Sequence, residues 1–250
     1  NLLDLLNAQD TVTFTGSAST GLKLKSNPNI LRENVSFTME ADSLNCIVLG
    51  EDVDPSKPEW EIFVKEVRKE MTVKAGQKCT AIRRIFVPDN RLEEMSGAIL
   101  KALAQTVIGN PANEKVRMGA LAGKDQRNEV RSQVQQLLAA SHIIYGSMDS
   151  VELLDADPVK GAFMSPLLLL NEHPFKGEAS HSIEAFGPVS TLMPYKNMEA
   201  AIELSKKGKG SLCSTIVTAD DMLAKQFVIA AAPYHGRILI LNRDCAKEST

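Results

Sequence analysis

The chain has 250 residues, of which 44% are hydrophobic and 24% are charged, and its formal net charge at pH 7 is -3. These are ordinary values for a globular protein that is long enough to bury a sizeable core. A sequence pI near 5.9 gives no electrostatic reason to expect a nucleic acid or an anionic membrane as a partner. No apolar run approaches the length of a membrane span, and the start of the chain lacks the features of a signal peptide. Because the first residue is not Met, we expect a fragment or a processed product.

The four cysteines are scattered along the chain, without a CxxC pair and without a histidine at zinc-ligand spacing. The sequence therefore predicts no metal site. Cys46 and Cys213 lie inside apolar, β-branched runs, and we expect both in the core. This cysteine pattern is typical of a reduced, cytoplasmic protein.

Short β-branched runs alternate with helical patterns along most of the chain. The predicted strands are residues 11–15, 34–39, 45–49, 81–87, 142–146, 162–170, 187–195, 211–218 and 237–242. The predicted helices, in which apolar residues recur at helical spacing, are residues 57–71, 89–106, 123–140, 197–207 and 220–232. Strands that alternate with helices of this length indicate βαβ units. The predicted fold is therefore α/β, with a doubly wound, mostly parallel sheet.

The clearest break in composition is the acidic, proline-punctuated stretch GEDVDPSKPEW, residues 50–60. Stretches of this kind are typical of the segments between domains. We therefore expect one domain over residues 1–54 and a second, larger domain over residues 55–250.

The stretch FTGSASTG, residues 14–21, runs from a predicted strand into a helix that we expect to open at Gly21. Glycines at such a turn, here followed by a serine (Gly16-Ser17), let a phosphate approach the backbone, and a helix N-terminus favours its negative charge. The pattern is neither GxGxxG nor a Walker loop. By itself it favours an ordinary strand-to-helix turn.

Two carboxylates lie close to predicted strands. Glu40, in FTMEADSLN, comes just after one strand, and Glu184, in EAFGPV, lies in a turn that leads into another. A carboxylate can act as a catalytic base or hydrogen-bond a ribose at such places. Each stretch by itself is more typical of a solvated or capping side chain on the surface.

Cys79 lies in the stretch VKAGQKCTAIRR, whose residues favour a catalytic role more strongly than those of the three stretches above. Gly76 gives the backbone freedom, and Lys78 with the nearby Arg83 and Arg84 favours a thiolate over a thiol. Exposed amides in such a turn can also stabilise an oxyanion. None of the four histidines lies in a setting that marks it as a base for this cysteine, so a Cys-His hydrolase lacks an identified base.

Taken in order, these stretches resemble the aldehyde dehydrogenase superfamily. That family carries F-T-G-S-x-x-x-G, then a Glu after a strand, then G-Q-x-C, then E-x-F-G-P. The matching positions here are residues 14–21, Glu40, residues 76–79 and residues 184–188, in the same order and at comparable separations. The resemblance implies an aldehyde dehydrogenase-like catalytic domain over residues 55–250, and the C-terminal part of the NAD(P)-binding domain over residues 1–54.

The stretch around Glu40 departs from the family's usual E-L-G-G-K, because residues 40–44 read EADSL. FTMEADSLNCIVLGEDVD, together with GQKCTAIRR, is similar to a narrower group, the dehydrogenase half of a bifunctional ring-opening enzyme of bacterial phenylacetate degradation. This resemblance implies a CoA-linked semialdehyde as the substrate. It also implies that two residues of the family's site lie upstream of this chain, an oxyanion-binding Asn and a ribose-binding Lys.

The resemblance assigns the catalytic roles to Cys79 and Glu40. Cys79, as a thiolate, attacks the aldehyde, and Glu40 activates the water that hydrolyses the resulting thioester. Two alternatives stay open. One is a thiol-dependent acyl transferase or esterase that uses Cys79 without a nucleotide, and the other is a non-catalytic assembly fragment.

The resemblance also implies NADP or NAD as the cofactor and a homo-oligomer as the intact enzyme. Gly16 and Ser17 are expected to border the pyrophosphate of the nucleotide. Glu184 is expected to bind the ribose on the nicotinamide side, with Phe186 of the same motif beside it.

Overall fold

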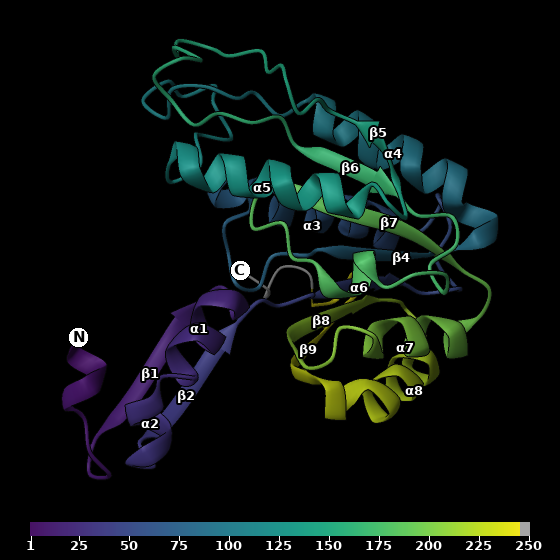
Figure 1. Ribbon diagram of the computed structural model, residues 1–250. Coiled ribbons are helices and arrows are strands. Elements are labelled where there is room, and N and C mark those ends of the chain that lie inside the picture. Colours follow the sequence, from purple (N-terminus) through teal and green to yellow (C-terminus); the bar gives the residue numbers. More distant parts are fainter. Residues whose placement is uncertain (246–250) are drawn as a thin grey trace. The chain divides into compact units, whose positions relative to one another are not determined.

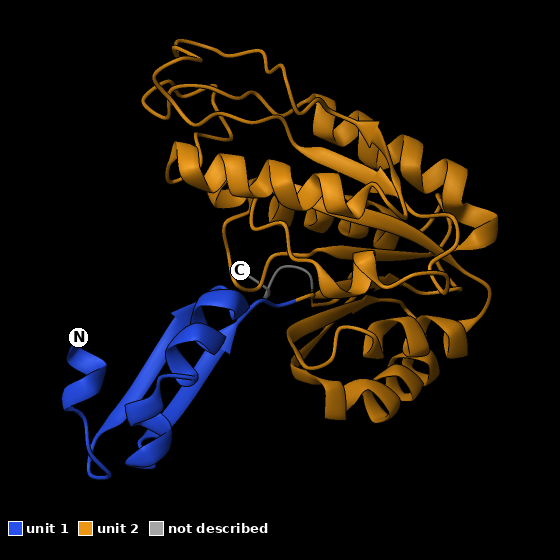
Figure 2. Ribbon diagram, in the orientation of Figure 1, with its two compact units in different colours: residues 1–43 blue, residues 44–250 orange. Residues whose placement is uncertain are grey.

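The computed structural model describes residues 1–245. The chain forms two compact units, Asn1–Ser43 and Leu44–Thr250, which are coloured separately in Figure 2. Residues 44–54, which the sequence-based boundary assigns to the first domain, belong to the larger unit. The reason is the strand β3 (Cys46–Leu49), which pairs with β4 on one side and β8 on the other inside the main sheet of that unit.

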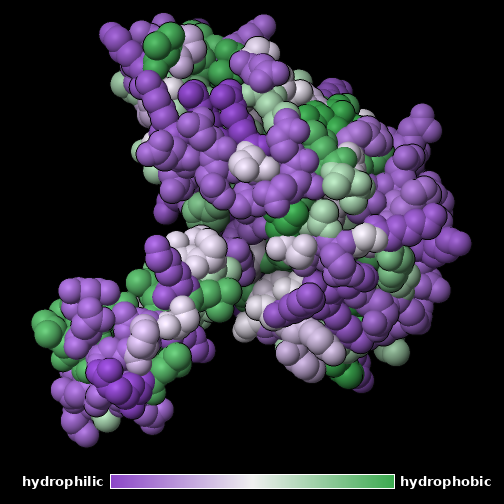
Figure 3. Space-filling model, viewed as in Figure 1, coloured by the Kyte–Doolittle hydropathy of each residue, from purple (hydrophilic) through white to green (hydrophobic). Residues whose placement is uncertain are grey.

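The small unit is a two-stranded parallel sheet with short helices. β1 (Thr11–Gly16) pairs with β2 (Ser36–Ala41), and α1 (Ala18–Lys25) and α2 (Pro28–Arg32) form the crossover between them. A short 3-10 helix, η1 (Leu2–Leu5), precedes β1. Of residues 1–43, all of which the structure describes, five are buried: Gly21, Asn29, Ile30, Val35 and Ser43. Hydrophobic and hydrophilic side chains are mixed over the surface of this unit (Figure 3).

The larger unit is built on a seven-stranded sheet in the order β5-β6-β7-β4-β3-β8-β9 (Figure 1). Its strands besides β3 are β4 (Arg84–Pro88), β5 (His142–Tyr145), β6 (Leu167–Leu170), β7 (Val189–Tyr195), β8 (Ser211–Val217) and β9 (His235–Leu241). The edge strand β5 pairs with β6 in antiparallel fashion, and the other strand pairs described are parallel. The structure thus confirms a mostly parallel sheet.

Helices cover both faces of this sheet, which makes it doubly wound. α3 (Pro58–Thr72) and α4 (Leu92–Ala104) pack on one face, where Ile47 and Leu49 of β3 point. α7 (Met198–Lys206) and α8 (Asp221–Ala231) pack on the other face, where Cys46 and Val48 point. α5 (Lys124–Leu137) covers the β6 end of that second face. Alternate residues of a strand point to opposite faces, so a strand buried on both faces is apolar throughout.

Most predicted elements appear close to their predicted bounds. The predicted strand 162–170 is shorter, because Pro166 has no backbone N–H for a sheet and β6 begins directly after it. The helix expected to open at Gly21 begins at Ala18 instead. The short helices α2 and α6 (Ala179–Ser182) were not predicted. Within residues 1–245, no helix has the combination of length and apolar character that a membrane span requires.

Candidate active site

Cys79 follows the 3-10 helix η2 (Val73–Gly76) in the loop that leads into β4. The four cysteines are free thiols, and Cys79 is exposed, whereas Cys46 is buried and Cys213 and Cys245 are half-buried. Burial raises the pKa of the Cys46 thiol and of the Cys213 thiol to about 11. Near neutral pH these two side chains are therefore neutral thiols, and Cys79 is the cysteine that is accessible to a substrate.

The backbone before Cys79 adopts a left-handed turn. Lys74, Ala75 and Gly76 are consecutive residues with φ values of 54°, 51° and 68°. For residues with a side chain this region costs about 1–2 kcal/mol each, so the surrounding packing must hold the turn in place. A Cβ atom at Gly76 would collide with the carbonyl group of Gly187. The glycine of G-Q-x-C and the glycine of E-x-F-G-P are therefore in direct contact, and their small size allows the two motifs to approach.

Arg83 connects the same two motifs. It is 5% exposed, and its guanidinium group donates to atoms on both sides. Nε donates to Glu184 Oε1 at 3.1 Å and Nη1 to the Gly187 carbonyl at 2.8 Å, while Nη2 donates to the Gly76 carbonyl at 2.9 Å. The guanidinium carbon also lies 5.3 Å from the centre of the Phe186 ring, within the range of a cation–π contact.

The three cations that the sequence places near Cys79 have different partners in the structure. Lys78 donates to Glu70, with an Nζ–Oε1 distance of 2.6 Å. Arg84 is fully buried on the other side of β4 and donates to backbone carbonyls of Leu44, Leu204 and Ser205 and to His181. Arg83 donates to the backbone carbonyls of Gly76 and Lys78. Of the three, Arg83 is thus the cation that joins the backbone of the cysteine loop to Glu184.

Asn45 holds the cysteine loop from the other side, and the sequence analysis assigned it no role. It is fully buried, and its Nδ2 donates to the Cys79 carbonyl at 2.8 Å and to the Ala81 carbonyl at 3.0 Å. Its Oδ1 accepts from the Cys213 backbone N–H at 2.9 Å. A buried polar group needs such partners. The sequence feature that pointed to this role of Asn45 was the position of an amide side chain immediately before the fully apolar strand β3.

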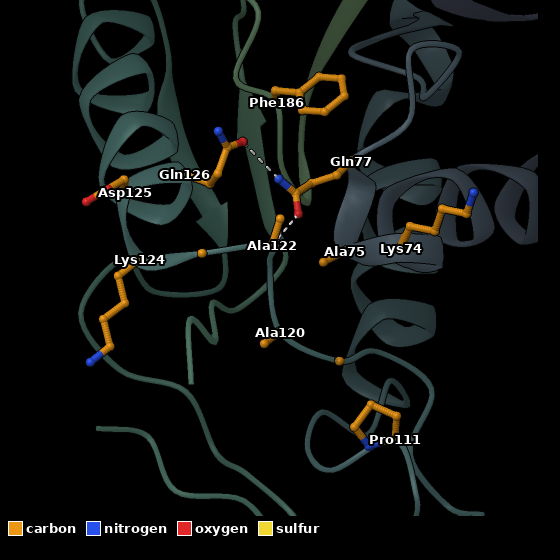
Figure 4. A pocket seen from close by; sticks show the side chains of 12 residues that line it. Lys74, Ala75, Gln77, Pro111, Ala120, Ala122, Lys124, Asp125, Gln126 and Phe186 are labelled. Atoms are coloured by element: carbon orange, nitrogen blue, oxygen red, sulfur yellow. Dashed lines mark hydrogen bonds between the residues drawn. The ribbon is translucent and has the colours of Figure 1, made fainter. Parts of the chain in front are cut away.

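A cavity of about 920 Å³ lies beside the cysteine loop. Figure 4 shows Gln77 in its wall, with its amide between Gln126 and the backbone of Ala122. Gln77 Nε2 donates to Gln126 Oε1 at 3.3 Å, and Gln77 Oε1 accepts from the Ala122 N–H at 2.8 Å. Phe186, which is 37% exposed, also lines this cavity. Gln77 of the G-Q-x-C motif therefore connects the cysteine loop, by hydrogen bonds, to the segment at the start of α5.

In the small unit, the strand β1 leads into the N-terminus of α1. Ser17 is the N-cap residue, and its Oγ accepts from the Thr20 N–H at 3.3 Å. The Ala18 N–H donates to Asp42 Oδ1 at 2.9 Å. One of the free amides of this helix end thus binds a carboxylate of the chain itself, at the place where the sequence analysis expects a phosphate. Asp42 belongs to the stretch that departs from the family's E-L-G-G-K.

Glu40 lies near the end of β2 and is exposed. In the parallel register it pairs with Thr15, and the next pair joins Gly16 to Ala41. Glu40 and the Gly16-Ser17 turn are therefore together at the carboxyl ends of two parallel strands, the edge at which open α/β sheets bind ligands.

The expected site residues thus form two groups. Cys79, Glu184 and Phe186 come together in the larger unit, where Arg83 joins the loops that carry them. Gly16, Ser17 and Glu40 come together in the small unit. Among the described residues, no three His, Cys, Asp or Glu side chains are grouped as a metal site requires.

A sequence profile of the aldehyde dehydrogenase family matches residues 6–236. The chain belongs to the aldehyde dehydrogenase family. The match spans residues of both units.

Relatives of this aldehyde dehydrogenase chain include the 3,4-dehydroadipyl-CoA semialdehyde dehydrogenase of Aromatoleum evansii. It is 36% identical over 242 residues, which are 97% of this chain and 47% of the relative. Protein MaoC of Klebsiella aerogenes is 44% identical over 135 residues, which are 53% of this chain and 38% of that protein. The chain therefore spans less than half the length of these two relatives.

Solved structures show the same fold. The crystal structure of betaine aldehyde dehydrogenase from Staphylococcus aureus in complex with NAD+ superposes with a TM-score of 0.80 at 23% sequence identity. The superposition covers 93% of this chain and 44% of the crystallised one. The α/β architecture predicted from the sequence is thus that of the aldehyde dehydrogenases.

Proposed function

We propose that the protein containing this chain oxidises a CoA-linked semialdehyde to the carboxylic acid with NAD or NADP as acceptor, and that Cys79 is its nucleophile. The observation that carries the proposal is the position of the one exposed cysteine. It lies in a loop that Arg83 fastens to Glu184 and Phe186, and these two residues belong to the motif expected at the cofactor. The substrate class follows from the relative that is named a CoA-semialdehyde dehydrogenase.

In the first half-reaction, the Cys79 thiolate attacks the carbonyl carbon and forms a tetrahedral thiohemiacetal. We assign the backbone amide of Cys79 to hold part of the charge of its oxyanion. Loss of hydride from that carbon leaves a thioester on Cys79. A bound nicotinamide nucleotide supplies the acceptor for that hydride.

In the second half-reaction, the thioester is hydrolysed. The Glu40 carboxylate takes a proton from water, the hydroxide formed attacks the thioester carbon, and the Cys79 thiolate leaves. Glu40 suits this role because it is exposed on β2 at the carboxyl edge of the small sheet.

We assign one group of residues to each end of a nicotinamide nucleotide. The aromatic Phe186 is partly exposed along a 920 Å³ cavity, and we assign it, with Glu184, to the nicotinamide side. The Gly16-Ser17 turn at the start of α1 is assigned to the pyrophosphate, because a helix N-terminus favours phosphate.

The proposal extends to the biological setting. We assign the substrate to phenylacetate catabolism, the protein to the cytoplasm, and the intact enzyme to a homo-oligomer. The free state of the four cysteines supports a reducing compartment. Growth of a deletion strain on phenylacetate, cell fractionation and light scattering of the full-length protein test these three assignments.

Single-turnover kinetics of the full-length protein test the reaction. The wild type is expected to give a burst of reduced nucleotide with a CoA-linked semialdehyde, followed by steady turnover. Glu40→Gln should keep the burst and lose the steady turnover, whereas Cys79→Ser should lose both. Thioester or ester hydrolysis without any nucleotide reduction would instead identify a thiol-dependent acyl transferase or esterase. Inertness of the wild type in both assays would favour a non-catalytic assembly role.

A further inference from the structure

Arg83 is a buried cation whose three nitrogens are all hydrogen-bonded. Besides its bonds to Glu184, Gly187 and Gly76, Nη2 lies 3.3 Å from the Lys78 carbonyl. The side chains of Arg83 and Glu184 are only 4% and 5% exposed. The planar guanidinium group of Arg83 therefore spans two loops that lie about a hundred residues apart in the sequence, and each of its nitrogens has a hydrogen-bond partner.

Burial of the Arg83–Glu184 ion pair costs free energy, because both charged groups lose their contact with water. Burial lowers the pKa of the Arg83 guanidinium, and the Glu184 carboxylate acts in the opposite direction. A buried ion pair often stabilises a fold less than apolar side chains of similar volume do. A buried pair that joins a nucleophile loop to another functional loop therefore points to a role in positioning.

We propose that Arg83 is a positioning residue of the reaction, which fixes the nucleophile loop against the Glu184–Phe186 loop. The inference rests on the proposed function, because it takes Cys79 as the nucleophile and Glu184 and Phe186 as the cofactor side. Hydride transfer requires the reacting atoms at near-contact distance, and a displacement of about 1 Å can cost about 100-fold in rate. One guanidinium that contacts both loops sets that separation directly.

The chain provides a matched control in the next residue. Arg84 is also buried, and its donors also bind backbone carbonyls, but these belong to Leu44, Leu204 and Ser205. The electrostatic partner of Arg84 is Cys46. A structural role is thus expected for Arg84, and a positioning role for Arg83.

The test compares Arg83→Lys, Arg83→Met and Arg84→Lys in the full-length protein. Three quantities are measured: the single-turnover rate of nucleotide reduction at saturating nucleotide, the rate of Cys79 alkylation at one fixed pH, and the melting temperature. Arg83→Lys keeps the charge but not the fork, so hydride transfer should become about 100-fold slower. Arg83→Met should also alkylate Cys79 severalfold faster, because the loop that carries the thiol is no longer held in place. Arg84→Lys should lower the melting temperature and leave both rates unchanged.

Two results would overturn the inference. One is a wild-type rate of hydride transfer in Arg83→Lys, and the other is an equal loss of that rate in Arg83→Lys and Arg84→Lys. If Arg83→Met does not fold, the hydride-transfer rate of Arg83→Lys decides alone. A wild-type protein that reduces no nucleotide refutes the proposed function instead, and the alkylation rates of Arg83→Met and Arg84→Lys then still decide whether Arg83 fixes the cysteine loop.

Discussion

The two units of this chain differ in how they hold their functional residues. In the larger unit, helices cover both faces of a seven-stranded sheet, and the cysteine loop is held by fully or nearly fully buried side chains, Arg83 and Asn45. In the small unit, two strands carry Glu40 and the Gly16-Ser17 turn, and five of the 43 residues are buried. The comparison teaches that the proposed nucleophile, Cys79, has a support of buried side chains within its own unit, whereas the proposed base, Glu40, is carried by a sheet with almost no core of its own.

The largest expected effect is the difference in folding between the two units when each is produced as a separate piece. A peptide of residues 1–43 should be unfolded, because it buries too little apolar surface to offset its conformational entropy. A protein of residues 44–250 should fold on its own. Circular dichroism and urea titration of the two pieces measure this. A cooperative unfolding transition of the 1–43 peptide would break the comparison.

Two glycine-to-alanine substitutions in the larger unit test the rigidity of the cysteine loop. Gly76→Ala should destabilise the protein by about 3 kcal/mol, because the new Cβ meets the Gly187 carbonyl and the residue has φ = 68°. Gly97→Ala, at an exposed position of α4 without neighbours within 4 Å, should stabilise it by about 0.5–1 kcal/mol. Urea unfolding gives both values. Equal and small effects at both sites would show that the loop adapts to the added methyl group.

A buried histidine of the same unit should make its stability depend on pH. Burial lowers the pKa of His235, at the start of β9, to about 4, and neither ring nitrogen has a hydrogen-bond partner within the described part of the chain. The unfolded chain has a histidine pKa near 6.5, so it binds the proton first as the pH falls. The stability present above pH 6.5 is therefore lost between about pH 6.5 and pH 4, and the loss from His235 at pH 5 is about 2 kcal/mol.

His235→Phe removes this titration, so the difference in unfolding free energy between pH 7.5 and pH 5 should shrink by about 2 kcal/mol. Part of the pH dependence should remain, because burial also lowers the pKa of His181 to about 4. Urea titrations of both proteins at the two pH values provide the measurement. An unchanged difference would mean that His235 titrates at its ordinary pKa in the folded protein.

The smallest expected effect lies in the small unit. Asp42 accepts a hydrogen bond from the first amide of α1, so Asp42→Asn should strengthen nucleotide binding about threefold by removing a negative charge at that helix end. Asp10→Asn is the control, because Asp10 accepts from Asn7 away from this turn. Calorimetry with the full-length protein compares the two variants. Weaker binding by Asp42→Asn would show that the carboxylate orders the turn that a phosphate uses.

Local patterns in the sequence were sufficient for most elements of the fold, although not for the short helices α2 and α6. Apolar runs such as CIVL in β3 and the apolar stripe of α3 follow directly from burial on both faces of a sheet or on one face of a helix. Pro166 shows the limit of this approach, since one residue without an N–H shortened a predicted strand. The start of α1 was placed late because Ser17, its N-cap, was interpreted only as part of a phosphate turn.

What the sequence by itself determined about this protein is the class of sheet, the order of the motifs and the position of Cys79 in a glycine-containing turn, because each depends on residues close together in the chain. The tertiary structure decided which charges meet. Lys78 turned out to be paired with Glu70, and Arg83, rather than a more exposed cation, joins the cysteine loop to Glu184. The Arg83–Glu184 pair forms between segments about a hundred residues apart that the fold brings side by side, and no periodicity in the sequence records that they will meet.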